Sequence, residues 1–275
     1  MPSKHNRLFV LLFAASFGLF ANPANAQVLS IGVKGGISIP NLTSGKSYDP
    51  INSGYKSGLG PDIAIFADYP INGLLSIEGS LEYCSQGGVK NGKQALPVPG
   101  WAAGYFPPGQ VPPYLYANFD ASAKINYLMV PVLAKFGFDL DAGGSWRAYA
   151  DLGPFVGFLL SAKSVTKGSS YVYGDAGETM PITPVPVSFD TTADIKNQLN
   201  STNYGIAGNI GIAYQFGQHQ VFLEAGGNFG FRVIQKNSAD GQNRTGAAVV
   251  RLGYAFTLNR GAGKNGKALK EPNHF

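Results

Sequence analysis

Apolar residues alternate with small or polar residues in eight separate segments of this chain. In the first segment, the odd-numbered residues from Leu29 to Ile39 are apolar or glycine, whereas the even-numbered residues are serine, glycine or lysine. Successive side chains of a β-strand face opposite sides of the sheet, whereas a helix would mix the two sets around its circumference. The pattern therefore predicts eight two-faced strands, at residues 29–39, 59–69, 75–83, 128–138, 146–158, 204–216, 221–233 and 248–258.

The connections between these segments alternate between short and long. Short links at residues 70–73, 139–145 and 217–219 follow the second, fourth and sixth segments, while two of the other links span about residues 85–118 and 164–202. Short turns on the periplasmic rim and long loops on the outer rim are typical of transmembrane barrels, and a soluble sandwich offers no reason for such alternation. The sequence predicts an all-β fold: an eight-stranded antiparallel up-and-down transmembrane β-barrel with short periplasmic turns and long outer loops.

The two ends of the chain differ from the predicted barrel. Lys4 and Arg7 precede an uncharged apolar run at residues 8–21, and Ala24 and Ala26 supply the small residues of a cleavage site. The run is shorter than the roughly 20 residues of a membrane-spanning helix. We therefore predict a signal peptide at residues 1–26, an outer-membrane β-barrel at 27–258 and a polar, basic C-terminal tail at 259–275.

The distribution of charge argues against a nucleic-acid partner. The sequence pI is about 9.1, but residues 27–258 carry 15 basic and 15 acidic side chains, and the basic excess lies in the two terminal segments. A nucleic-acid-binding protein needs a basic stripe on its folded body. Only 13% of the residues are charged and 37 are glycine, which suits strands and tight corners. The expected partner is outer-membrane lipid.

The faces of the predicted strands place the charges inside the barrel. With the apolar faces toward lipid, the interior would hold five basic and five acidic side chains, a balance suited to a narrow lumen in which buried ions must pair. This candidate lumen charge network consists of Lys34, Asp62, Glu78, Glu82, Lys135, Arg147, Asp151, Glu224, Arg232 and Arg251. Eight strands leave an interior just wide enough for side chains to fill it, so we expect a plugged barrel. The functional alternative is a gated ion or proton path.

Residues suited to catalysis are scarce. After the predicted signal peptide, the histidines are His219, in a predicted short turn, and His274, in the tail. Neither can easily reach a nucleophile on the outer rim, and the single cysteine, Cys84, has no histidine or cysteine near it in sequence. We therefore predict that the protein is not an enzyme and that it has no catalytic residues, metal site or cofactor.

The long links contain candidate contact residues. The proline-rich stretch at residues 97–113 includes Trp101, Tyr105 and Phe106, which could contact a glycan or a protein partner. The alternative is a mobile outer loop with some local packing. The polar tail offers a second surface for an envelope protein partner, although a disordered, solvated tail is the safer expectation.

Several short motifs resemble the PorT-like outer-membrane β-barrel family. They are Gly32-Val33-Lys34-Gly35-Gly36, the Val130–Lys135 stretch, Gly153-Pro154-Phe155-Val156-Gly157 and Gly253-Tyr254-Ala255-Phe256. The resemblance implies an outer-membrane barrel and brings no catalytic residues with it.

We expect a structural or interaction role, including that of a subunit of an envelope or secretion assembly. Two alternatives stay open from the sequence. The first is a narrow transport or small-ligand-binding barrel, and the second is a soluble periplasmic barrel that binds an apolar ligand.

Overall fold

Eight long strands pair in a ring. The computed structural model describes residues 28–44, 50–51 and 53–258, so the predicted signal peptide and tail lie outside the described residues. The ring strands are β1 (Ser30–Ser44), β2 (Gly60–Pro70), β3 (Leu75–Ser85), β7 (Asp120–Asp139), β8 (Trp146–Lys167), β12 (Thr202–Phe216), β13 (His219–Gly230) and β14 (Asn243–Thr257). Each pairs antiparallel with the ring strands before and after it in the chain, and β14 pairs with β1. The predicted all-β, up-and-down antiparallel fold is confirmed.

Two ring strands are longer than the alternation predicted. β7 begins at Asp120 and β8 continues to Lys167, whereas the sequence pattern placed these limits at residues 128 and 158. The outward-facing residues in the additional stretches include Lys124 and Lys163, which are exposed. Where the outer face of a strand becomes polar, it no longer differs clearly from the inner face. The alternation of apolar and polar residues then does not reveal the strand.

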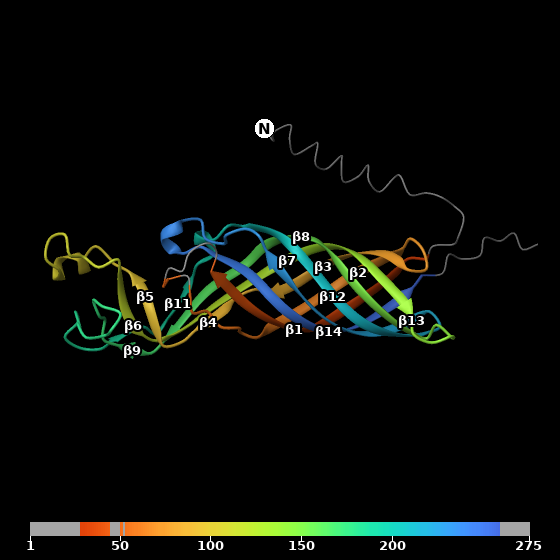
Figure 1. Cartoon of the computed structure of the whole chain (residues 1–275), viewed down its shortest axis with the longest axis horizontal. Helices are drawn as coiled ribbons and strands as arrows, with labels where there is room; N and C mark the ends of the chain where they lie inside the picture. The colour runs from red at the N-terminus through yellow and green to blue at the C-terminus, as the bar shows by residue number, and fades with distance from the viewer. Residues whose placement is uncertain (1–27, 45–49, 52, 259–275) are drawn as a thin grey trace, which may run out of the picture.

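The long links fold into small elements of their own. They contain β4 (Gly88–Lys90), β5 (Lys93–Pro97), β6 (Tyr114–Asn118), β9 (Ser169–Ser170), β10 (Val187–Ser188) and β11 (Thr191–Asp194), with 3-10 turns η1 (Ala102–Tyr105), η2 (Lys196–Gln198) and η3 (Ser238–Asp240). We call residues 91–118 and 168–190 the head. In Figure 1 the head extends the molecule beyond one end of the barrel, the long-loop end. The opposite end, with the three short turns, is the short-turn end. None of the helical turns among the described residues is long and apolar enough to cross a membrane.

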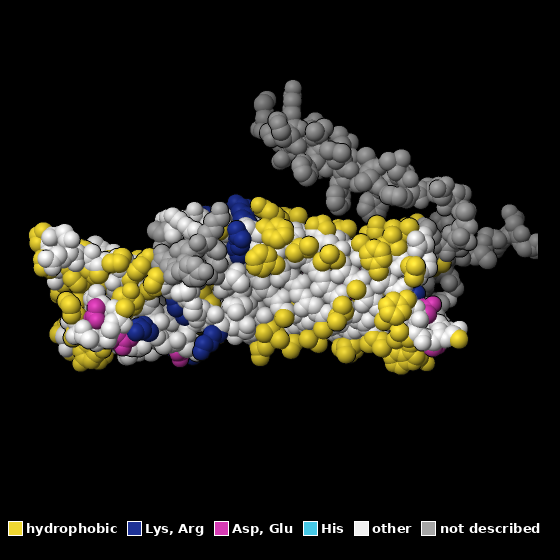
Figure 2. All heavy atoms as spheres, in the orientation of Figure 1, with side chains coloured by type: hydrophobic (Ala, Val, Ile, Leu, Met, Phe, Trp, Pro, Cys, Tyr) yellow, Lys and Arg dark blue, Asp and Glu magenta, His cyan; other side chains and the backbone are white. Residues whose placement is uncertain are grey.

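The barrel wall has an apolar outside. Leu152 is 58% exposed and Ile210 is 67% exposed, while the residues that flank Leu152 in the chain, Asp151 and Gly153, face inward. Figure 2 shows apolar side chains over the visible face of the barrel and charged ones toward its two ends. The predicted alternation therefore becomes an outside-apolar wall, as lipid requires.

Glycines on the inner face make room for aromatic rings. A Cβ on Gly253 would lie 2.1 Å from the Phe222 ring, and one on Gly32 would lie 2.5 Å from the Phe66 ring. Phe66 and Phe222 meet edge to face across the lumen, with ring centroids 5.6 Å apart. The glycines thus allow large side chains of neighbouring strands to fill the short-turn end.

Candidate functional site: the barrel interior

The interior of the barrel is filled in three layers. The layer at the short-turn end is an apolar cluster of Phe66, Tyr149, Ala213, Phe222 and Ala255. The layer at the long-loop end is a second apolar cluster: Leu42, Cys84, Ile125, Tyr127, Met129, Phe155, Leu159, Ala162, Leu199 and Ile234. Along β8, the inward-facing Asp151 lies between Tyr149 and Phe155, so a charged layer separates the two apolar ones.

Two lysines pair with glutamates in the charged layer. The Lys34 Nζ lies 2.7 Å from Oε1 of Glu78 and 3.0 Å from Oε1 of Glu224. Lys135 of β7 binds the other carboxylate oxygen of Glu78. These side chains come from four strands, so the ion pairs connect the wall across the lumen as well as along it.

Arg251 contacts three carboxylates. Its Nε donates to Oδ1 of Asp62 at 2.5 Å, and its Nη2 lies 3.0 Å from Oδ2 of Asp62 and 2.7 Å from Oε1 of Glu82. Nη1 reaches Oε1 of Glu224 at 3.3 Å. All four side chains are at most 4% exposed. A guanidinium has five donors in a fixed plane and suits such a multi-carboxylate contact better than an ammonium.

The structure corrects the prediction for two basic residues. Arg147 lies at the short-turn rim, where it pairs with Asp139 at 2.8 Å and donates to the carbonyl of Gly73. Arg232 follows the end of β13 and donates to Thr202 and to the side-chain oxygen of Asn200. The alternation of the strand faces assigned both residues to the inside, but it gave no position along the barrel axis. Of the ten predicted residues, eight come together: Lys34, Asp62, Glu78, Glu82, Lys135, Asp151, Glu224 and Arg251.

Neutral residues that the prediction omitted complete the layer. The Tyr149 hydroxyl donates to Oε2 of Glu224 at 3.1 Å. The backbone and side-chain nitrogens of Asn209 donate to Oδ1 of Asp151 at 2.9 and 2.8 Å. Asn209 is the register partner of Asp151, and that signal could have identified it. Tyr149 is opposite Gly211, which in turn pairs with Glu224, so its hydroxyl reaches Glu224 across a glycine.

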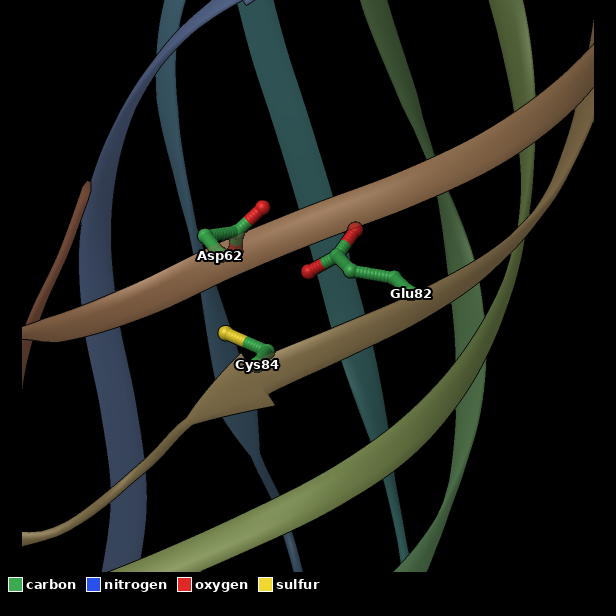
Figure 3. Close-up of side chains that lie close together, drawn as sticks. All are labelled: Asp62, Glu82 and Cys84. Atoms are coloured by element: carbon green, nitrogen blue, oxygen red, sulfur yellow. The ribbon is translucent and has the colours of Figure 1, made fainter. Parts of the chain in front are cut away.

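One group of side chains has the spacing of a metal site. A carboxylate oxygen from each of Asp62 and Glu82 and the Cys84 sulfur lie within 4.8 Å of one another, and Figure 3 shows the three side chains side by side on β2 and β3. However, Arg251 already contacts both oxygens of Asp62 and one of Glu82. A metal ion would have to displace this guanidinium and deprotonate a buried thiol. The arrangement is better explained by the binding of both carboxylates to Arg251.

The predicted loop contacts divide into two kinds. Trp101 and Tyr105 are 61% and 62% exposed and contact each other edge to face. Phe106 is half-buried and packs on the small core of the head, formed by Ala102, Leu115 and Val172, so less of its ring is open to a partner. Beside Trp101 is an apolar groove of about 320 Å³, lined also by Pro97, Pro99, Val187 and Phe189.

A closed antiparallel wall with an apolar outside and paired charges inside defines an integral outer-membrane barrel. The sequence matches the family described as outer membrane protein beta-barrel domain over residues 20–236, and the chain belongs to this family. Its location in the outer membrane is thereby confirmed.

Several solved structures are similar to this chain. Neisserial surface protein A is 13% identical with a TM-score of 0.36, and the match covers 83% of this chain and 97% of that one. Ail of Yersinia pestis is 12% identical with a TM-score of 0.35 and coverage of 82% and 98%. OprG of Pseudomonas aeruginosa is 12% identical with a TM-score of 0.36 and coverage of 85% and 97%. A search of curated proteins gave no match.

Proposed function

We propose that the protein is a plugged outer-membrane barrel that anchors a folded head for binding a partner in the cell envelope. The observation that carries this proposal is the exposed apolar surface of the head. Trp101, Tyr105 and Val185 are each more than 60% exposed, although the head buries an apolar core of its own. Aromatic residues on a rigid support are typical anchors of protein interfaces.

The filled interior supports anchoring over transport. Phe66 and Phe222 lie on one side of the ion pairs, and Tyr127 and Phe155 lie on the other. A solute would have to displace both apolar layers and break charge pairs that are almost completely buried, such as Lys34 with Glu78 and Arg251 with Glu224. A narrow transport barrel is therefore the weaker function, and we expect no single-channel conductance in planar bilayers.

We infer a non-enzymatic role on similar grounds. His219 lies at the short-turn end, where its Nδ1 is 2.6 Å from the Tyr254 hydroxyl and its ring stacks on Phe216. The buried acids already have basic or amide partners. The PorT-like resemblance favours a partner from an envelope or secretion assembly, with the short turns in the periplasm and the head outside.

Site-specific photo-crosslinking in intact cells tests the partner contact. A photoreactive residue at position 101 or 105 should yield a discrete protein adduct, whereas the same residue at position 152, in the apolar wall, should yield lipid adducts. Removal of both aromatic rings, by W101S with Y105S, should weaken an adduct formed from position 185. If positions 101, 105 and 185 all give no protein adduct, the proposed partner surface is wrong.

A further inference from the structure

Two lysines face each other on the outside of the barrel wall. Lys124 of β7 and Lys163 of β8 are direct partners in the strand register, and both are exposed, while their chain neighbours Ile125 and Ala162 are buried. Like charges directly opposite each other in an antiparallel pair are destabilising. Such a pair is therefore expected where an anion binds between the two ammonium groups.

The protein itself supplies little compensation for these charges. In the described residues, neither ammonium lies within 4.0 Å of a carboxylate. Asp194 of β11 is the register partner of Lys163, but its Oδ1 accepts a hydrogen bond from the backbone of Lys196, which adds another exposed positive charge. The row across the wall thus has two lysines and one aspartate, Lys124, Lys163 and Asp194, and Lys196 follows in η2.

The lysines lie at the edge of the apolar wall. From Trp146 to Phe158 the outward-facing residues of β8 are uncharged, and this span corresponds to roughly 30 Å across the membrane at about 3.3 Å per residue and a tilt of about 40°. Lys163 follows five residues later, about 13 Å farther, at the depth of lipid headgroups. Figure 2 shows basic side chains gathered at this edge, on the side of the head.

We propose that Lys124 and Lys163 bind the phosphate of a membrane lipid in the leaflet on the long-loop side. The phosphate would lie between the two ammonium groups and cancel their repulsion, since lysine binds phosphate as a point charge. The lipid's acyl chains would lie on the apolar side chains below, including Phe158 and Leu160, which are 46% and 42% exposed. This apolar contact favours a lipid over free phosphate. The proposal depends on the barrel fold and not on the partner surface of the head.

Lipid binding can be measured on the full-length protein in phosphatidylcholine nanodiscs that contain phosphatidic acid as the probe. Retained phosphatidic acid is counted by native mass spectrometry. We expect K124Q with K163Q to lower the apparent affinity roughly 25-fold, since each basic residue near a membrane surface contributes about fivefold. K124R with K163R should retain binding, because both charges remain.

The matched control is K93Q with K167Q, which removes two exposed lysines farther out on the head and the end of β8. Equal losses in the two double variants would reduce the effect to general surface charge and overturn the proposal. Inorganic phosphate that competes as well as the lipid would also overturn it, in favour of a free-anion site. A heat-dependent gel shift for every variant establishes that the barrels are folded.

Discussion

The barrel and the head expose large apolar side chains to nearly the same extent, yet they are built in opposite ways. Leu152 of the barrel is 58% exposed and Trp101 of the head is 61% exposed. Behind Leu152 is a charged interior in which Arg251 and Glu224 pair. Behind Trp101 is the apolar core around Leu115. Equally exposed apolar side chains therefore have different surroundings: lipid around the barrel, and water or a partner around the head.

The difference follows from which groups each region must bury. In lipid, the wall must satisfy its backbone hydrogen bonds within a closed ring and keep charges inside. The head extends beyond the apolar wall and must bury apolar groups, as a water-soluble domain does. Lys124 and Lys163 lie close to the transition between the two arrangements.

Removal of Arg251 should produce the largest loss of stability. R251M would leave Asp62, Glu82 and Glu224 without their shared cation, and breaking a buried ion pair typically costs about 3–5 kcal/mol. The chain has two tryptophans, so urea unfolding in detergent can be followed through Trp146 in a W101F background. R251K should lose less. Unchanged unfolding of R251M would contradict the role assigned to the charged layer.

A cavity in the head should affect the head alone. Leu115 is 1% exposed, and a buried Leu→Ala change typically costs about 2–5 kcal/mol. L115A should lower the urea midpoint reported by Trp101 in a W146F background and accelerate proteolysis within residues 91–118. The barrel's heat-dependent gel shift should stay as in the parent. Loss of that shift would mean that the two regions fold as one unit.

A charge placed on each exposed apolar surface separates lipid from water most directly. L152R puts an arginine in the lipid-facing wall, where the expected cost is about 2–4 kcal/mol near the middle of the bilayer. W101R changes an equally exposed residue of the head and should alter stability by less than about 0.5 kcal/mol. Urea unfolding of both variants in lipid vesicles gives the comparison. Similar costs at the two positions would refute the assignment of their surroundings.

The wall was predictable from sequence because the membrane imposes two environments on every strand. Strand parity put Glu78 and Arg251 on the inner face, where both are buried. It could not give the position of a residue along the barrel axis, so the predicted network included Arg147 and Arg232, which contact other residues. The structure of the head was harder to predict from the sequence. Its elements pair between distant segments, as Tyr116 of β6 does with Tyr173, and no periodic pattern indicates that Phe106 packs against the core.

The smallest expected effect concerns a turn of the head and depends on pH. The backbone amide of Met180, together with that of Thr179, donates to the Asp175 carboxylate and lowers its pKa. A lowered pKa means that the stabilisation is complete above the ordinary aspartate pKa of about 3.9 and is lost as the pH falls through the folded-state pKa. These contacts hold a turn in which Glu178 has a φ of 59°.

D175N should therefore remove the acid-dependent opening of this turn. In the parent protein, hydrogen exchange at the amides of Thr179 and Met180, corrected for intrinsic rates, should speed up as the pH falls below about 4. In D175N the protection should be lower throughout and independent of pH. Asp141, whose pKa is lowered by the amides of Trp146 and Ser145, provides the matched control in the barrel. D141N should disturb only the short turn that contains Asp141, because β7 and β8 are paired on either side of this turn. Acid-dependent exchange that persists in D175N would assign the opening to another group of the head.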